Sequence, residues 1–188
     1  MALFRFEHKD YWIVAANKIA TTSLSKCPEL ERISEEVYMF QKPIYWIVRN
    51  PIGRILSQWH WVFSQNPDTY IGAEFGIIES IAEHKPFARD FEYFKTWLKD
   101  NIHKLPDSND YHWGSQHNFI RDLGLSPDQL RIMPVESLNR LLPNIQRFNS
   151  SIWKFKLSRK IAHQQIKSIV VSHFEKDYNV YTQARNSE

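Results

Sequence analysis

Two short stretches of the sequence combine a cation with hydroxyl side chains at a spacing that suits an anion-binding site. The first stretch, NKIATTSL, covers residues 17–24 and follows an apolar, β-rich run over residues 11–16. The second stretch runs from Arg49 to Ser57 and follows a similar apolar run over residues 44–48. Lysine and arginine supply positive charge, and serine and threonine hydroxyls supply hydrogen-bond donors. Both sets therefore suit a phosphate or a sulfate group.

In the first stretch, Lys18 stands where a buried strand is expected to turn into a helix. Such a turn points several backbone N–H groups at one spot, where the helix dipole also favours negative charge. An exposed lysine before a helix that Thr21 or Thr22 caps in the ordinary way would give the same pattern. The triphosphate-binding pattern GxxxxGK[ST] is not met, because no glycine occurs between residues 1 and 52.

In the second stretch, Arg49 ends a strand and Ser57 lies two turns into the helix that follows. Pro51 is well placed in the first turn of that helix. A strand end and the start of the next helix can share a pocket, so both side chains could reach one phosphate. Arg54 shares a helix face with Ser57, at i and i+3. A surface helix with routine charges is the competing interpretation.

The elements that must position these residues alternate between strands and helices. Apolar, β-rich runs predict strands at 11–16, 44–48 and 130–135. Helical spacing predicts helices at 21–26, 51–64, 73–83, 87–103, 136–148 and 158–177. We therefore expect a three-layer α/β fold, with a mostly parallel central sheet and flanking helices. Ligands of such sheets bind beyond the carboxyl ends of the strands, which is where both cationic stretches fall.

Composition narrows the functional classes. The chain has 188 residues, a formal net charge of +3 and one cysteine, Cys27. This length suits a single domain over residues 1–188. The modest charge argues against nucleic acid as a partner, and one cysteine excludes internal disulfides and multi-cysteine metal sites. Because we see no signal peptide and no apolar run long enough to span a membrane, we expect a cytoplasmic protein without a membrane anchor.

Together, the two cationic stretches resemble the signatures of the sulfotransferases that use 3′-phosphoadenosine 5′-phosphosulfate (PAPS), especially the carbohydrate-type, Golgi-like branch. The first stretch is similar to the family's P-K-x-x-x-T-S-L-like loop, with Asn17 in place of proline. The second, RNPIGRILS, is similar to its R-D-P-x-x-R-x-x-S signature, with Asn50 in place of aspartate. The resemblance implies a fold like that of the P-loop nucleoside-triphosphate hydrolases.

Three further segments extend the resemblance along the chain. Residues 111–116, YHWGSQ, look like the family's H-W-x-P-Q segment, with Ser115 in place of proline. Residues 135–138, VESL, follow a predicted strand, as the family's glutamate segment does. Residues 173–178, HFEKDY, are similar to its C-terminal Y-x-x-D-Y ending.

The resemblance implies how PAPS would be held and used. Backbone N–H groups of residues 17–23 and the hydroxyls of Thr22 and Ser23 would bind the 5′-phosphosulfate, and Arg49 with Ser57 would bind the 3′-phosphate. Sulfuryl transfer is similar to phosphoryl transfer, with in-line attack and charge developing on the leaving oxygen, which Lys18 would stabilise. No metal is required. The implied nucleotide-binding set is Asn17, Lys18, Ile19, Ala20, Thr21, Thr22, Ser23, Arg49 and Ser57.

The expected acceptor is a hydroxyl group of a carbohydrate or a small molecule, and it needs a base to take its proton. Histidine and glutamate can do so near neutral pH. His112 is the first candidate because it lies in a loop that matches a family motif. His60 is the second, because it follows the start of the predicted phosphate-binding helix. Glu136 and His117 are further candidates, and a structural role for His112 stays open.

Two other functions are compatible with parts of the sequence. A P-loop kinase of a small metabolite would share the fold, but it predicts a Walker glycine-lysine pair and an acidic strand end for Mg²⁺. Here the second strand ends at Arg49, which favours a phosphate over a metal. A non-catalytic domain that binds sulfated or phosphorylated ligands would tolerate loss of Lys18. Neither the identity of the acceptor nor the oligomeric state follows from the sequence.

Overall fold

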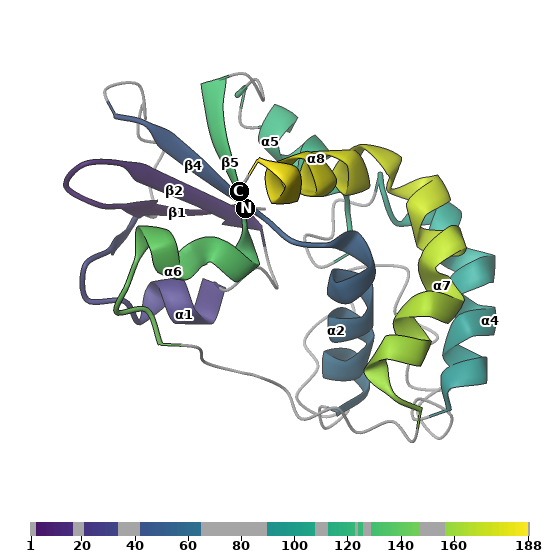
Figure 1. Ribbon diagram of the computed structural model, residues 1–188. Coiled ribbons are helices and arrows are strands. Elements are labelled where there is room, and N and C mark those ends of the chain that lie inside the picture. Colours follow the sequence, from purple (N-terminus) through teal and green to yellow (C-terminus); the bar gives the residue numbers. More distant parts are fainter. Residues whose placement is uncertain are drawn as a thin grey trace.

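The computed structural model describes residues 3–16, 21–33, 42–64, 90–107, 113–122, 124–125, 129–146 and 157–187. These residues form an α/β fold around a five-stranded mixed sheet (Figure 1). The strands lie in the order β3-β1-β2-β4-β5. Their bounds are β1 (Leu3–Glu7), β2 (Trp12–Ala16), β3 (Glu31–Ile33), β4 (Ile44–Val48) and β5 (Leu130–Pro134).

The three strands that the sequence predicts are present, and they form the parallel part of the sheet. β4 pairs in parallel with β2 on one side and with β5 on the other. β1 pairs antiparallel with both β2 and β3. The expectation of a mostly parallel sheet is therefore met only at β2, β4 and β5. The two antiparallel strands were not predicted.

Helices lie on both sides of the sheet, and three of them pack together beyond it. In Figure 1, α1 and α6 lie along one side of the sheet, and α5 and α8 lie along the other. α2 continues from the end of β4 and lies beside α7, which in turn lies beside α4. The bounds are α1 (Thr21–Ser25), α2 (Pro51–Ser64), α4 (Phe91–Asn101), α5 (Gln116–Asp122), α6 (Leu138–Leu141), α7 (Arg159–His173) and α8 (Glu175–Asn186). Two 3-10 turns, η3 (Ile102–Lys104) and η5 (Val135–Ser137), complete the described elements.

Several predicted helix bounds were wrong. The helix expected over 136–148 begins as the 3-10 turn η5 and ends at Leu141, because Leu142 precedes Pro143 and leaves the helical region with φ −129° and ψ 83°. The helix expected over 158–177 is two helices that meet at Phe174, whose φ of −114° and ψ of 37° break the α-helical path. α5 was not predicted.

Of two other predicted helices, one is present and one lies outside the described residues. The helix expected over 87–103 begins within the described residues at Phe91, where Asp90 caps it by accepting the Glu92 N–H at 2.9 Å. It continues through Asn101 and tightens into η3. The helix expected over 73–83 and the loop expected over 66–72 lie outside the described residues.

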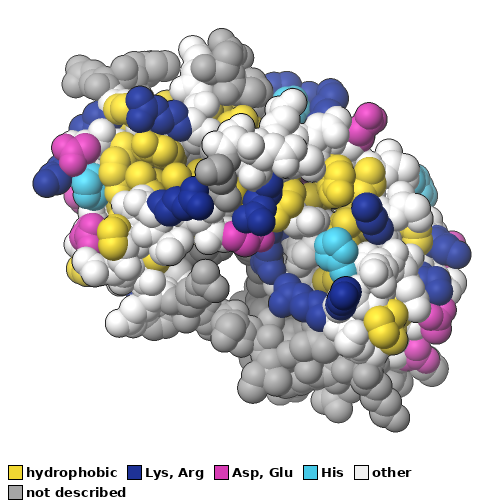
Figure 2. All heavy atoms as spheres, viewed as in Figure 1, with side chains coloured by type: hydrophobic (Ala, Val, Ile, Leu, Met, Phe, Trp, Pro, Cys, Tyr) yellow, Lys and Arg dark blue, Asp and Glu magenta, His cyan; other side chains and the backbone are white. Residues whose placement is uncertain are grey.

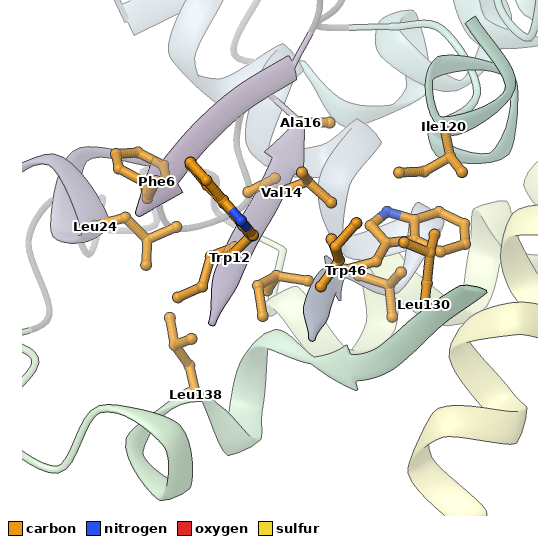
Figure 3. Packing of buried hydrophobic residues seen from close by; sticks show 14 of the residues in the cluster. Phe6, Trp12, Val14, Ala16, Leu24, Trp46, Ile120, Leu130 and Leu138 are labelled. Carbon is orange, nitrogen blue, oxygen red and sulfur yellow. The ribbon is translucent and has the colours of Figure 1, made fainter. Parts of the chain in front are cut away.

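Two hydrophobic clusters support these elements. In the sheet cluster, Ile120 from α5 and Leu130 lie next to Trp46, while Leu24 from α1 lies next to Phe6 (Figure 3). The helical cluster joins α2, α4 and α7, and its central side chains include Ile55, Trp59, Phe94, Leu98, Ile166 and Val170. Among the described helices, none is long and apolar enough to cross a membrane. A single domain over residues 1–188 stays a prediction.

Candidate functional site

The strands that precede the two cationic stretches, β2 and β4, end at the same edge of the sheet. β2 and β4 are neighbours and run in parallel, with Ala15 opposite Ile47. β2 ends at Ala16 and β4 ends at Val48, so residue 17 and residue 49 follow the carboxyl ends of adjacent strands. The carboxyl ends of adjacent parallel strands are the position at which open α/β sheets bind ligands, and a joint anion site of the two stretches stays a prediction.

The turn from β4 into α2 is built by the residues that follow Arg49. Asn50 caps the helix, because its Oδ1 accepts the Ile52 N–H at 3.0 Å and its carbonyl accepts the Arg54 N–H at 3.0 Å. Pro51 occupies the first helical position, where a missing N–H costs no helical hydrogen bond. Asn50 thus caps the helix as an aspartate at this position would. The positive end of the α2 dipole lies directly after Arg49.

Arg49 and Ser57 lie along one face of α2. The Nε of Arg49 lies 4.0 Å from the position that a Cβ on Gly53 would occupy, so the arginine side chain passes over the first turn of the helix. Ser57 is half-buried and follows Gly53 by four residues, which places it one turn further along the same face. Binding of one phosphate by Arg49 and Ser57 together stays a prediction.

Arg49 lies near ionisable groups of both signs. Burial lowers the pKa of Arg49 to about 10, and the guanidinium of Arg159 at the start of α7 acts in the same direction, as does Arg54. Glu136 and Tyr181 act in the opposite direction, and the Tyr181 hydroxyl donates to Glu136 Oε1 at 3.3 Å. Arg49 stays charged at neutral pH, so a half-buried cation is kept near a second one. Figure 2 shows Lys and Arg side chains gathered near the middle of this face, with an acidic side chain among them.

Asp177 joins α8 to the start of α5. Its Oδ1 accepts hydrogen bonds from the Ser115 hydroxyl at 2.7 Å and from the His117 N–H at 2.9 Å, and its Oδ2 accepts the Gln116 N–H at 2.8 Å. The carboxylate therefore caps α5 from a different helix, and its charge suits the positive end of α5. Asp177 is 2% exposed, so these bonds are made in the interior. We call Arg54, Ser115, Gln116, His117 and Asp177 the Asp177 network.

Arg54 ties this network to α2. Its side chain is fully buried, and its Nη2 lies 3.6 Å from Asp177 Oδ2. The same nitrogen donates to the Gly114 carbonyl at 2.6 Å, and the guanidinium lies over the ring of Phe174 at 5.7 Å. The second arginine of the R-x-x-x-x-R spacing is thus held in the interior, while the first arginine, Arg49, lies at the strand end.

Gln116 pairs with the main chain of Arg49. The Arg49 N–H donates to Gln116 Oε1 at 3.0 Å, and Gln116 Nε2 donates to the Arg49 carbonyl at 2.9 Å. Sequence reasoning missed the roles of Gln116 and Asp177. The only signal that marked them was that each lies in a segment resembling the sulfotransferases, and the structure brings those two segments into contact.

The remaining predicted site residues fall into two groups. Glu136 is exposed in η5, His117 is half-buried in α5, and Ser23 is buried in α1. The others lie outside what the structure describes, either entirely or in their side chains. Asn17, Lys18, Ile19, Ala20 and His112 are outside entirely, and only the helical backbone is described for Thr21, Thr22 and His60.

The described part of the chain shows no metal site, and comparison with known proteins finds no match. Within the described ranges, no three His, Cys, Asp or Glu side chains are grouped as they would be around a metal ion. Metal independence stays a prediction. No family model, curated protein or solved structure matches the chain. We therefore argue the function from its residues and its fold.

Proposed function

We propose that the protein is a PAPS-dependent sulfotransferase, which transfers a sulfuryl group from PAPS to a hydroxyl of a carbohydrate or small-molecule acceptor. The observation that carries this proposal is the parallel pairing of β2 with β4, which sends the two cationic stretches out from one edge of the sheet. PAPS carries two separate anionic groups, a 5′-phosphosulfate and a 3′-phosphate. Two adjacent anion sites suit such a molecule better than a single site would.

The surroundings of Arg49 support a phosphate at the second stretch. Arg159 disfavours the charge of Arg49, and a dianionic 3′-phosphate bound near Arg49 would offset that cost. Arg159 begins α7, whose first turn Ser158 caps by accepting the Ile161 N–H at 3.4 Å. We add Arg159 to Arg49 and Ser57 as a residue that binds the 3′-phosphate.

The proposed fold is the three-layer, P-loop-like arrangement that the resemblance implies. Helices on the two sides of the sheet are consistent with it, and so is the parallel core of β2, β4 and β5 (Figure 1). β1 and β3 would then be an antiparallel extension at one edge of the sheet.

In the proposed reaction, the acceptor oxygen attacks sulfur in line with the leaving phosphate oxygen, and Lys18 stabilises the charge that develops there. The base that takes the acceptor proton is His112, with His60 as the alternative. Glu136 lies within electrostatic reach of Arg49, at the proposed 3′-phosphate end, which favours the histidines.

Titration with adenosine 3′,5′-bisphosphate, the desulfated product, tests the nucleotide site. We expect binding to the wild-type protein and a dissociation constant about 10- to 100-fold higher for Arg49→Ala, the loss typical of a hydrogen bond to a charged group. Arg131→Ala is the matched control, because Arg131 is an exposed arginine near the amino end of β5. An equal dissociation constant for Arg49→Ala and wild type would remove Arg49 from the site.

The same titration separates the competing functions. A P-loop kinase would bind ATP with Mg²⁺ in preference to the bisphosphate. A non-catalytic anion-binding domain would bind the bisphosphate but would release no labelled sulfate to any acceptor from labelled PAPS. Transfer that is lost in Lys18→Ala, together with bisphosphate binding that persists, would support the sulfotransferase alone.

A further inference from the structure

We infer that Gln116 is a positioning residue, which sets Arg49 by holding its main chain, and that Asp177 and Arg54 in turn hold Gln116. The inference rests on the proposed function only in assigning a phosphate to Arg49. The hydrogen bonds on which it depends are independent of any ligand.

The Gln116 side chain pairs with Arg49 as a neighbouring strand would. In a hydrogen-bonded pair of residues on antiparallel strands, each residue gives one N–H and one carbonyl to the other. Here the amide oxygen accepts the Arg49 N–H at 3.0 Å and the amide nitrogen donates to the Arg49 carbonyl at 2.9 Å. The pairing of β4 with β5 ends at Val48, which lies opposite Pro134. Gln116 thus pairs with the first residue after β4, where the chain turns into α2.

The side chain of Gln116 is itself held in place. It is 1% exposed, its main-chain N–H donates to Asp177 Oδ2 at 2.8 Å, and its Nε2 lies 3.5 Å from the same oxygen. Asp177 pairs with Arg54, which lies five residues beyond Arg49 on α2. Hydrogen bonds and an ion pair therefore link the Arg49 main chain through Gln116 and Asp177 to Arg54, and the covalent chain from Arg49 to Arg54 closes the ring.

This ring fixes the main chain of Arg49 relative to α2, the helix that carries Ser57. A side chain that starts from a fixed main chain loses less freedom when it binds an anion. Removing the amide of Gln116 leaves the Arg49 guanidinium unchanged, but it loosens the Arg49 main chain from which that side chain extends. We expect this to raise the dissociation constant of a 3′-phosphate nucleotide by about 2- to 10-fold, the usual cost of ordering one long side chain.

Amide hydrogen exchange, measured by NMR, tests the positioning role directly. Gln116→Met keeps the length of the side chain and removes both hydrogen bonds to Arg49. We expect the Arg49 amide to exchange at least about 10-fold faster in this variant, while the Trp97 amide in α4 keeps its wild-type rate. An Arg49 amide that exchanges rapidly in the wild-type protein would overturn the inference, and this measurement needs no variant.

A double-mutant cycle tests the link to the anion, with adenosine 3′,5′-bisphosphate as the probe. Gln116→Met should weaken binding in the wild-type background and have no effect in Arg49→Ala, because the glutamine acts through Arg49. Equal weakening in both backgrounds would show a general structural defect and overturn the inference. If the wild-type protein binds no bisphosphate, the proposed function fails, and the exchange rate of the Arg49 amide alone decides the role of Gln116.

Discussion

Replacing Asp177 with asparagine should destabilise the protein strongly. The carboxylate accepts hydrogen bonds from Ser115 at 2.7 Å, from the main-chain N–H groups of Gln116 and His117 at 2.8 and 2.9 Å, and it pairs with Arg54 at 3.6 Å. An amide keeps one acceptor oxygen but turns an NH₂ group toward some of these donors. It also leaves the buried guanidinium of Arg54 without the negative charge beside it.

The size of the effect follows from the position of Asp177 and Arg54, whose charged side chains are both fully buried. Removing one partner of a buried ion pair typically costs about 3–5 kcal/mol. A domain has about 5–15 kcal/mol of net stability, so this one change would take a large part of it. For a chain of this length, each kcal/mol shifts Tm by about 2–4 °C, so we expect Tm to fall by about 6–20 °C.

Urea unfolding, followed by tryptophan fluorescence and by far-UV circular dichroism, measures this loss. Asp100→Asn is the matched control, because Asp100 is exposed near the end of α4. It should stay within about 0.5 kcal/mol of wild type. If Asp177→Asn unfolds at the same urea concentration as the control, the Asp177 network does not hold α8 against α5, and our account of the site is wrong.

Three further predictions concern stability. Gly53→Ala should stabilise the protein by about 0.5–1 kcal/mol in scanning calorimetry, because the new methyl group would meet Arg49 at an ordinary 4.0 Å; a loss would show that the first turn of α2 needs glycine. Burial raises the pKa of Tyr11 to about 12, and the Tyr11 hydroxyl donates to the Leu141 carbonyl. Because tyrosine in the unfolded chain loses its proton near pH 10, the stability of the folded protein should fall between about pH 10 and 12. Tyr11→Phe should flatten that fall in urea midpoints taken at about pH 9 and pH 11, and an equally steep fall would contradict it. Asp90→Ala removes the N-cap of α4 and should lower the free energy of unfolding, measured in urea, by about 1 kcal/mol. An unchanged urea midpoint would show that this cap does not stabilise the protein.

The three predicted strands are apolar runs, of which β2 and β4 are largely buried on both faces, whereas Arg131 in β5 is exposed. β2 and β4 read as continuous apolar runs because parallel strands inside a sheet are covered on both sides. β3 gives no such signal, since it has three residues at an edge, two of them exposed. β1 alternates between Phe and polar residues, a pattern typical of a strand with one covered face.

Helix ends depended partly on contacts that the sequence does not display. Pro143 was a local signal for the end of α6, and it could have been used. The break at Phe174 has no such signal, because the apolar spacing continues across it. Phe174 is buried in the helical cluster beneath Arg54, and this tertiary contact accompanies the change of direction between α7 and α8.

In the candidate site, too, local spacing could be predicted from the sequence, whereas contacts between distant segments could not. The spacing of Arg54 and Ser57 is local, so helix geometry alone predicted that those two share a face, and for Arg49 and Ser57 the sequence predicted a shared pocket. The Asp177 network joins residues that are 62 positions apart in the case of Ser115 and Asp177. Such a pairing depends on how α5 packs against α8, and a single sequence carries no direct record of it. The resemblance to sulfotransferases marked these segments without assigning roles to their residues.

The most direct test of the proposed function is transfer of labelled sulfate from PAPS to a panel of hydroxyl-bearing acceptors, with wild type compared against Lys18→Ala. We predict acceptor-dependent transfer by the wild-type protein, and a rate lower by about 100- to 1,000-fold in Lys18→Ala, the usual loss when a group that stabilises developing charge is removed. Transfer by Lys18→Ala at the wild-type rate would contradict the mechanism. Absence of transfer to every acceptor by a wild-type protein that binds the bisphosphate would contradict the assignment as an enzyme.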